Sequence, residues 1–190
     1  MRLAGRLAGL GAAALLTLAS VAHAEQRAVA TAHPLATEAA EGVLADGGNA
    51  FDAAVAASAA LAVVEPSGSG LGGGGFWLLH QAETQRSVMV DGRETAPSAA
   101  SREMYQHPPE GLPESPSLAG PLAAGIPGEP AALAHIAAEY GRLPLRRSLA
   151  PAIELAREGF AVDAAYQRKA RFRQELLRRY PSSARIFLDD

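Results

Sequence analysis

The chain has 190 residues, a formal net charge of −3 and no cysteine. The near balance of charge argues against a nucleic-acid-binding protein, because such proteins usually carry a basic surface for phosphates. The absence of cysteine excludes disulfides, thiol catalysis and cysteine-ligated zinc, and the length is sufficient for one domain with its own core.

The first 24 residues have the pattern of a secretory signal peptide. Arg2 and Arg6 precede an almost wholly apolar stretch, residues 7–21, which is followed by the small-x-small pattern of residues 22–24 (AHA). The stretch is short for a membrane span, which needs about 20 strongly apolar residues. We therefore expect cleavage after Ala24 and a mature chain, residues 25–190, that is periplasmic or secreted and free of the membrane. The alternative is an uncleaved membrane anchor.

The first elements expected in the mature chain are a weak strand and two helices. Residues 28–31 are short and partly β-branched, which favours a strand. Apolar residues then recur at helical spacing over residues 35–45, after a proline at the first turn. A second helix, residues 50–64, follows a Gly-Gly stop and the N-cap residue Asn49. Because this helix is apolar on nearly every side, we expect both of its faces to be buried.

A glycine-rich segment, residues 68–75 (GSGLGGGG), separates these helices from a predicted β-hairpin. The hairpin strands are expected at residues 76–79 and 87–91, with a polar turn at residues 83–86.

The second half of the chain is predicted to be a long surface loop followed by helices. The loop covers residues 96–120, with one helical turn near Met104. The helices are expected over residues 129–140, 145–158 and 163–179. The order of helices, hairpin and helices predicts a mixed, layered α/β architecture rather than a doubly wound sheet.

The glycine-rich segment does not fit a nucleotide-binding loop. A dinucleotide-binding fingerprint follows a strand and opens a helix, whereas here a helix precedes the glycines and a strand follows them. A P-loop ends in Gly-Lys-Ser/Thr, and Phe76 and Trp77 stand there instead. Glycine allows a positive φ and close backbone approach, so we expect a tight turn against another strand or a ligand. Free backbone N–H groups in such a turn could also stabilise an oxyanion.

Arg93 and Glu94 directly follow a predicted strand, at a position where proteins often display site residues. An arginine there can bind a carboxylate at two points, which a lysine cannot do. The alternative is a structural ion pair between Arg93 and either Asp91 or Glu94. Composition by itself favours the ion pair and leaves both roles open.

The other candidate site residues carry less information. The histidines show no metal spacing, and His80 is expected to be a strand-end residue. No serine lies in a Gly-x-Ser-x-Gly elbow. The last predicted helix is basic, which suggests a nucleic-acid or membrane stripe, but acidic residues elsewhere favour a solvated face or a contact to an acidic segment. Its basic residues are Arg168, Lys169, Arg171, Arg173, Arg178 and Arg179.

A series of short blocks in fixed order resembles the large-subunit part of the γ-glutamyltranspeptidases. The blocks are residues 47–55 (GGNAFDAAV), 70–76 (GLGGGGF), 91–97 (DGRETAP), 125–128 (GIPG), 140–145 (YGRLPL) and 156–160 (AREGF). The resemblance covers residues 28–163 clearly and the last stretch loosely.

This resemblance implies part of an N-terminal-nucleophile hydrolase with an αββα sandwich. In that family the precursor cuts itself, and the new N-terminal threonine of the small subunit attacks the γ-glutamyl carbonyl. Glutathione is the usual donor, and the acyl group passes to water, an amino acid or a peptide. The implied partners are a γ-glutamyl substrate and the small subunit from the same precursor; neither cofactor nor metal is implied.

On the match at residues 91–97, Arg93 would bind the α-carboxylate of the γ-glutamyl group and Glu94 would orient Arg93. The family's Thr-Thr-His-x-Ser-Val-Val-Asp segment is not found, so no catalytic residue is expected in this chain. We therefore expect an incomplete N-terminal part of the large subunit that is inactive and poorly folded by itself. The alternatives are a related acylase that cleaves a cephalosporin side chain or another amide, and a non-catalytic exported remnant.

Overall fold

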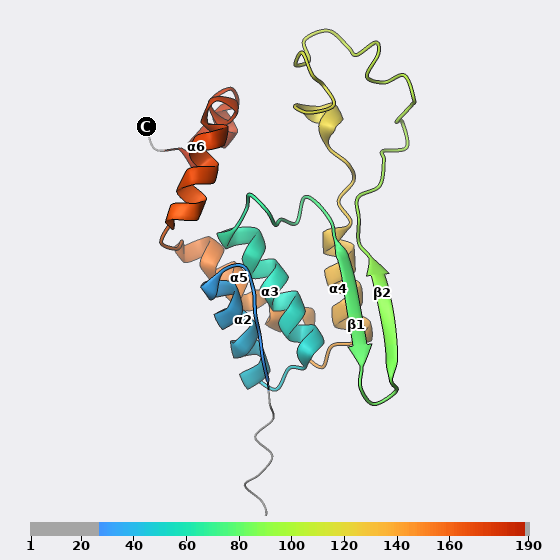
Figure 1. Ribbon diagram of the computed structural model, residues 1–190, viewed down its shortest axis with the longest axis vertical. Helices are drawn as coiled ribbons and strands as arrows, with labels where there is room; N and C mark the ends of the chain where they lie inside the picture. Colours follow the sequence, from blue (N-terminus) through green and yellow to red (C-terminus); the bar gives the residue numbers. More distant parts are fainter. Residues whose placement is uncertain (1–26, 189–190) are drawn as a thin grey trace, which may run out of the picture.

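The computed structural model describes residues 27–188, so the predicted signal peptide lies outside the described residues. Four helices, α2 to α5, pack together, and a β-hairpin of strands β1 and β2 lies against α3 and α4 (Figure 1). A long loop rises from the end of the hairpin, and two further helices, α6 and α7, follow α5. The predicted order of helices, hairpin and helices is confirmed, and so is the mixed α/β class.

The first two helices begin where their capping residues predict. In α2 (Pro34–Ala45), His33 is the N-cap and its ring Nδ1 accepts a hydrogen bond from the backbone N–H of Leu35. In α3 (Ala50–Val64), Asn49 is the N-cap, and its side chain accepts from the first backbone N–H groups of the helix. A polar side chain at this position satisfies donors that have no partner within the helix.

Asp52 joins the start of α3 to the connection between α4 and α5. Its side chain is fully buried and accepts backbone N–H groups from Asn49 (2.9 Å), Arg142 (2.9 Å) and Leu143 (3.3 Å). An added Cβ at Gly141 would lie 2.5 Å from Asp52 Oδ1, so this approach also requires a glycine. Two blocks of the sequence pattern, residues 47–55 and 140–145, therefore meet at one carboxylate.

The strand expected at residues 28–31 is wrong. These residues have no regular secondary structure, although the segment runs extended beside α2 and α3 (Figure 1). A strand needs a neighbour to pair its backbone N–H and C=O groups, and within the described residues none lies beside it. A groove of about 980 Å³ runs along this segment, over α3 and as far as Trp77.

The hairpin consists of β1 (Phe76–Gln81) and β2 (Arg86–Asp91), paired antiparallel with Phe76 opposite Asp91. Successive side chains point to opposite faces of a strand. Leu79 lies on the inner face and packs with a core cluster from α3 and α4. The outer face exposes apolar side chains, namely Phe76, Leu78 and Met89. The sheet is thus buried on one face only.

The loop and helices predicted after the hairpin are confirmed, but the helical turn expected near Met104 is wrong, because the chain forms only hydrogen-bonded turns there. Residues 96–120 form a loop without helix, which turns near Met104 and extends away from the helical layer (Figure 1). A short 3-10 helix, η1 (Pro121–Ala123), was not predicted. The helices α4 (Glu129–Glu139) and α5 (Leu145–Glu158) follow, with the expected bounds to within one residue.

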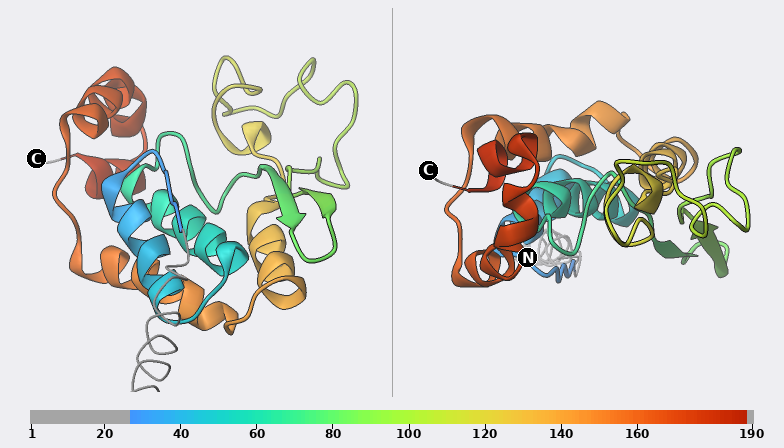
Figure 2. Two further views of the ribbon diagram at one scale, coloured as in Figure 1. Left: turned by 60° about the horizontal axis from the view of Figure 1, so that its bottom comes forward. Right: turned by 90° about the horizontal axis from the view of Figure 1, so that it is seen from above.

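The chain ends in α6 (Ala164–Arg178) and α7 (Pro181–Phe187), of which α7 was not predicted. Asp163 caps α6, as expected, and its side chain accepts the backbone N–H of Tyr166. Both views in Figure 2 place these helices at the opposite end of the molecule from the hairpin. Across residues 27–188, no helix has the length and apolar character that a membrane crossing requires.

The α3 helix is buried less evenly than its composition predicts. Alanines from α2, α3 and α5 form one core cluster, in which small side chains allow the helix backbones to approach closely. The residues of this cluster are Ala36, Ala39, Ala59, Ala60 and Ala152. On another side of α3, Ala54, Ala57 and Leu61 are only half-buried and line the groove beside residues 28–31. One face of α3 is therefore buried, and the face toward the groove is covered only in part.

Candidate functional site

The backbone around Arg93 is held from two sides. Gly92, just past the end of β2, exchanges backbone hydrogen bonds with Gly75, with N–O distances of 2.9 and 3.3 Å. Thr95 does the same with Ile126, at 3.1 and 2.8 Å, and so forms an isolated bridge to the segment before α4. Arg93 and Glu94 therefore lie between the glycine-rich segment and residues 125–128. This fixed backbone sets the direction in which the arginine leaves the sheet.

The guanidinium of Arg93 is only partly engaged by the protein. Nη1 donates to the carbonyl oxygen of Gly74 at 3.3 Å, and Nε lies 3.5 Å from Glu94 Oε2. The carbon of the guanidinium lies 5.9 Å from the ring centre of Phe76. The side chain remains 54% exposed, and no described residue pairs with Nη2. A planar guanidinium with free N–H groups is suited to a carboxylate.

The ion pair weighed as an alternative for Arg93 is present with Glu94 but not with Asp91. Asp91 Oδ1 accepts the backbone N–H of Arg93 at 3.0 Å and so fixes the turn after β2. Exposed ion pairs contribute little to stability, about 0–1 kcal/mol. The pair with Glu94 therefore adds little to stability, and it does not prevent Arg93 from binding a ligand.

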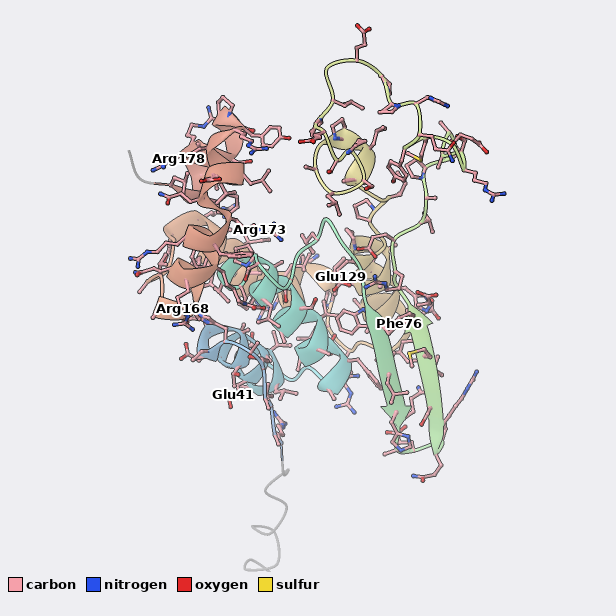
Figure 3. All side chains as sticks on the ribbon, turned by 45° about the horizontal axis from the view of Figure 1, so that its top comes forward. Glu41, Phe76, Glu129, Arg168, Arg173 and Arg178 are labelled. Atoms are coloured by element: carbon pink, nitrogen blue, oxygen red, sulfur yellow. The ribbon has the colours of Figure 1, made fainter. Side chains whose placement is uncertain are left out.

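Arg93 and Glu94 line a cleft of about 780 Å³. Its walls also include Ser58 of α3, Glu129 of α4 and the backbone of residues 73–75. Figure 3 shows Glu129 at the start of α4, near Phe76 at the start of β1. Arg168, Arg173 and Arg178 lie along α6, away from this region. The cleft thus combines one arginine with two carboxylates from separate elements.

Glu129 and Ser58 are members of the cleft that reasoning from the sequence missed. Glu129 is only 7% exposed, and its Oε1 accepts the hydroxyl of Ser58 at 2.6 Å. A signal was available, because an acidic residue in the first turn of a helix is favoured by the helix dipole. The pairing itself joins residues 71 positions apart, which no local pattern reveals.

At the start of the helix that follows the site, two backbone N–H groups are already bonded within the protein. The carbonyl oxygen of Gly73 accepts the backbone N–H groups of Gly128 and Glu129, both at 3.1 Å. These two N–H groups lie at the start of α4, where an anion would otherwise accept hydrogen bonds from them. Residues 68–75 also contain no glycine with positive φ, and within this segment it is Gly74 whose close approach to the backbone of Gly92 and Arg93 requires glycine. The expected role against another strand is confirmed.

Among the described residues, no histidine and no residue of α6 lines this cleft. His80 Nδ1 lies 3.0 Å from Ser87 Oγ across the hairpin, and His33 caps α2. Residues 27–188 contain no group of three or more metal-type side chains that could hold an ion. On α6, Lys169 pairs with Glu65 at 2.6 Å, and burial raises the pKa of Tyr166 above its ordinary value of 10.0. The other basic side chains of α6 are solvent-exposed.

Comparison with known protein families gives one consistent result. A family model described as Gamma-glutamyltranspeptidase matches residues 36–190. The glutathione hydrolase proenzyme of Escherichia coli (strain K12) is 40% identical over 166 residues, covering 86% of this chain and 28% of that protein. The proenzyme of Bacillus subtilis (strain 168) is 39% identical over 152 residues. The chain spans about a quarter of the length of these curated relatives.

Solved structures agree with the sequence comparison. The γ-glutamyltranspeptidase of Helicobacter pylori superposes with a TM-score of 0.76 and 37% identity, covering 85% of this chain and 46% of that chain. A cephalosporin acylase from Bacillus halodurans has a TM-score of 0.69 and 33% identity, covering 77% of this chain and 27% of that chain.

Proposed function

Since the chain belongs to the γ-glutamyltranspeptidase family, we propose that it supplies the carboxylate-binding part of an enzyme that cleaves γ-glutamyl amides such as glutathione. Its helical layer and hairpin are part of the αββα sandwich of an N-terminal-nucleophile hydrolase. The complete enzyme would transfer the glutamyl group to water, an amino acid or a peptide. It would consist of this large-subunit part and a small subunit from the same precursor.

The position of Arg93 carries the proposal. Its backbone is held on both sides, its side chain is half-exposed in a cleft, and part of the guanidinium is free. A γ-glutamyl substrate differs from other amides in the free α-carboxylate of its glutamyl part. A guanidinium binds such a group through two parallel hydrogen bonds. Glu94, 3.5 Å from Nε, would orient the arginine from the other side.

In the proposed reaction the nucleophile is an N-terminal threonine outside these 190 residues. Its hydroxyl oxygen attacks the γ-carbonyl carbon while the free amine takes the hydroxyl proton. The C–N bond then breaks, and the leaving amine receives that proton. Water or an acceptor amine cleaves the glutamyl ester and restores the threonine. Arg93 holds the α-carboxylate and so sets the distance between the γ-carbonyl and the threonine.

The test is Arg93→Ala in the complete precursor protein. We would measure kcat/KM for γ-glutamyl p-nitroanilide and for 4-aminobutyryl p-nitroanilide, which lacks the α-carboxylate. The unmutated enzyme should prefer the first substrate strongly. Loss of one partner from a charge pair that bound substrate would bury costs about 2–5 kcal/mol, so the preference should fall by about 30-fold to a few thousand-fold.

The matched control is Arg86→Ala, which removes an exposed arginine from the other end of β2. This variant should keep the preference of the unmutated enzyme. An Arg93→Ala enzyme that still prefers the substrate with the α-carboxylate would disprove the proposal.

The second candidate function is amide hydrolysis by a related acylase. The similarity to the B. halodurans cephalosporin acylase supports it. An acylase of this kind has no need for an α-carboxylate on its substrate. It would show no preference between the two anilides, and Arg93→Ala would leave their ratio unchanged.

A further inference from the structure

We propose that the backbone of the glycine-rich segment positions the guanidinium of Arg93 for substrate binding. Gly74 and Gly128 lie against the backbone of this arginine, and Gly73 lies beside Glu94. We refer to these three glycines as the glycine clamp. The inference rests on the proposed role of Arg93. It adds that recognition of the γ-glutamyl carboxylate depends on backbone that acts through the arginine.

The clamp leaves no room for a side chain on either side of Arg93. A Cβ added at Gly74 would overlap the carbonyl oxygen of Gly92 and would lie 2.8 Å from the Cα of Arg93. On the other side, a Cβ at Gly128 would overlap the carbonyl oxygen of Arg93 itself. Real Cβ atoms essentially never approach backbone atoms below 3.0 Å. Any side chain at either position would therefore displace the backbone of Arg93.

Hydrogen bonds join the two sides of the clamp to each other and to the guanidinium. The carbonyl oxygen of Gly73 accepts from the backbone N–H groups of Gly128 and Glu129. The next carbonyl, that of Gly74, accepts from Arg93 Nη1 at 3.3 Å. The same short segment thus holds the start of α4 and the head of the arginine. Movement of this segment would turn the remaining N–H groups of Arg93 away from a bound carboxylate.

Three consecutive glycines provide a graded test because their surroundings differ. A Cβ at Gly72 would meet nothing within 4 Å. One at Gly73 would lie 3.3 Å from Glu94 Oε1, the far end of a flexible side chain, and one at Gly74 would collide with backbone. None of the three has a positive φ, so alanine brings no backbone strain of its own. Only the distance to Arg93 and Glu94 changes along the series.

The experiment compares Gly72→Ala, Gly73→Ala and Gly74→Ala in the complete precursor. The readout is the ratio of kcat/KM between γ-glutamyl and 4-aminobutyryl p-nitroanilide. Gly72→Ala should keep the ratio of the unmutated enzyme. Gly73→Ala should lower it by about threefold or more, because Glu94 must shift to accept the methyl group and a misplacement of about 1 Å can cost about 100-fold. Gly74→Ala should lower the ratio nearly as far as Arg93→Ala does.

A double variant separates positioning from general damage. Gly73→Ala added to Arg93→Ala should cause no further fall in the ratio, because the group that it positions is already gone. If Gly74→Ala yields no folded enzyme, Gly73→Ala decides the question, since its new methyl group meets only a movable side chain. If Gly73→Ala leaves the ratio unchanged, including the case in which kcat/KM falls equally for both substrates, the inference is overturned while the role of Arg93 stays intact. If Arg93→Ala itself keeps the preference for the substrate with the α-carboxylate, the proposed function fails, and with it the positioning role of the clamp.

Discussion

Asp52 is a fully buried carboxylate that accepts backbone N–H groups from two distant parts of the chain. Burial of an ionised group is unfavourable unless hydrogen bonds satisfy it, and here three donors do so. The same residue completes the capping box at the start of α3. A single side chain thus fixes where α3 begins and where the connection from α4 to α5 lies.

We expect Asp52→Ala to lower the free energy of unfolding by about 3 kcal/mol or more, because it leaves buried backbone donors without acceptors. The measurement is the urea midpoint of the complete precursor. The control is Asp46→Ala, which removes a carboxylate from an exposed pair with Arg147. That pair should contribute less than about 1 kcal/mol. Equal losses for the two variants would contradict the anchoring role of Asp52.

At the scale of elements, local signals predicted the helices better than the strands. The caps Asn49 and Asp163 and the proline at the start of α2 set the helix bounds to within one or two residues. The hairpin was found from two β-rich runs and a polar turn. Residues 28–31 failed as a strand because strand formation depends on a neighbour, and sequence pattern does not supply one. The short helix α7 was missed because seven residues carry little periodicity.

We expect the predicted signal peptide to be cleaved from the chain after Ala24. The apolar stretch and the pattern at residues 22–24 support the proposal that the mature protein is periplasmic or secreted. N-terminal sequencing of the exported protein should begin at Glu25. Full-length protein retained in the membrane fraction, beginning at Met1, would instead favour the uncleaved anchor.

At the scale of the whole molecule, the described chain leaves much apolar surface uncovered. The outer face of the hairpin exposes Phe76, Leu78 and Met89, and Leu78 is 73% exposed. The groove along α3 adds a second uncovered region, in which alanine is the most frequent lining residue. Soluble proteins rarely expose contiguous apolar patches beyond a few hundred Å². Further protein that covers both regions would stabilise this fold.

We therefore expect residues 25–190 by themselves to be inactive and poorly folded. They should bind a hydrophobic dye such as ANS and unfold without a cooperative transition. The complete precursor, prepared in parallel, should bind little dye and unfold cooperatively. A monomeric 25–190 chain with a sharp unfolding transition would show that the uncovered faces are tolerated.

Local sequence patterns by themselves predicted most of the helices, the hairpin and an arginine at a strand end that can bind a carboxylate. Caps, apolar spacing and turn residues act over a few positions, so the sequence displays them directly. The resemblance of ordered blocks then indicated the family, which the comparisons established.

Tertiary structure decided what surrounds Arg93. The pairing of Ser58 with Glu129 spans 71 positions, and that of Asp52 with Arg142 spans 90. The sequence predicted a tight glycine turn against another strand or a ligand, and only packing showed that Gly74 and Gly128 leave no space beside Arg93. Steric fit between distant segments depends on how the helices and the hairpin meet, which local patterns do not specify.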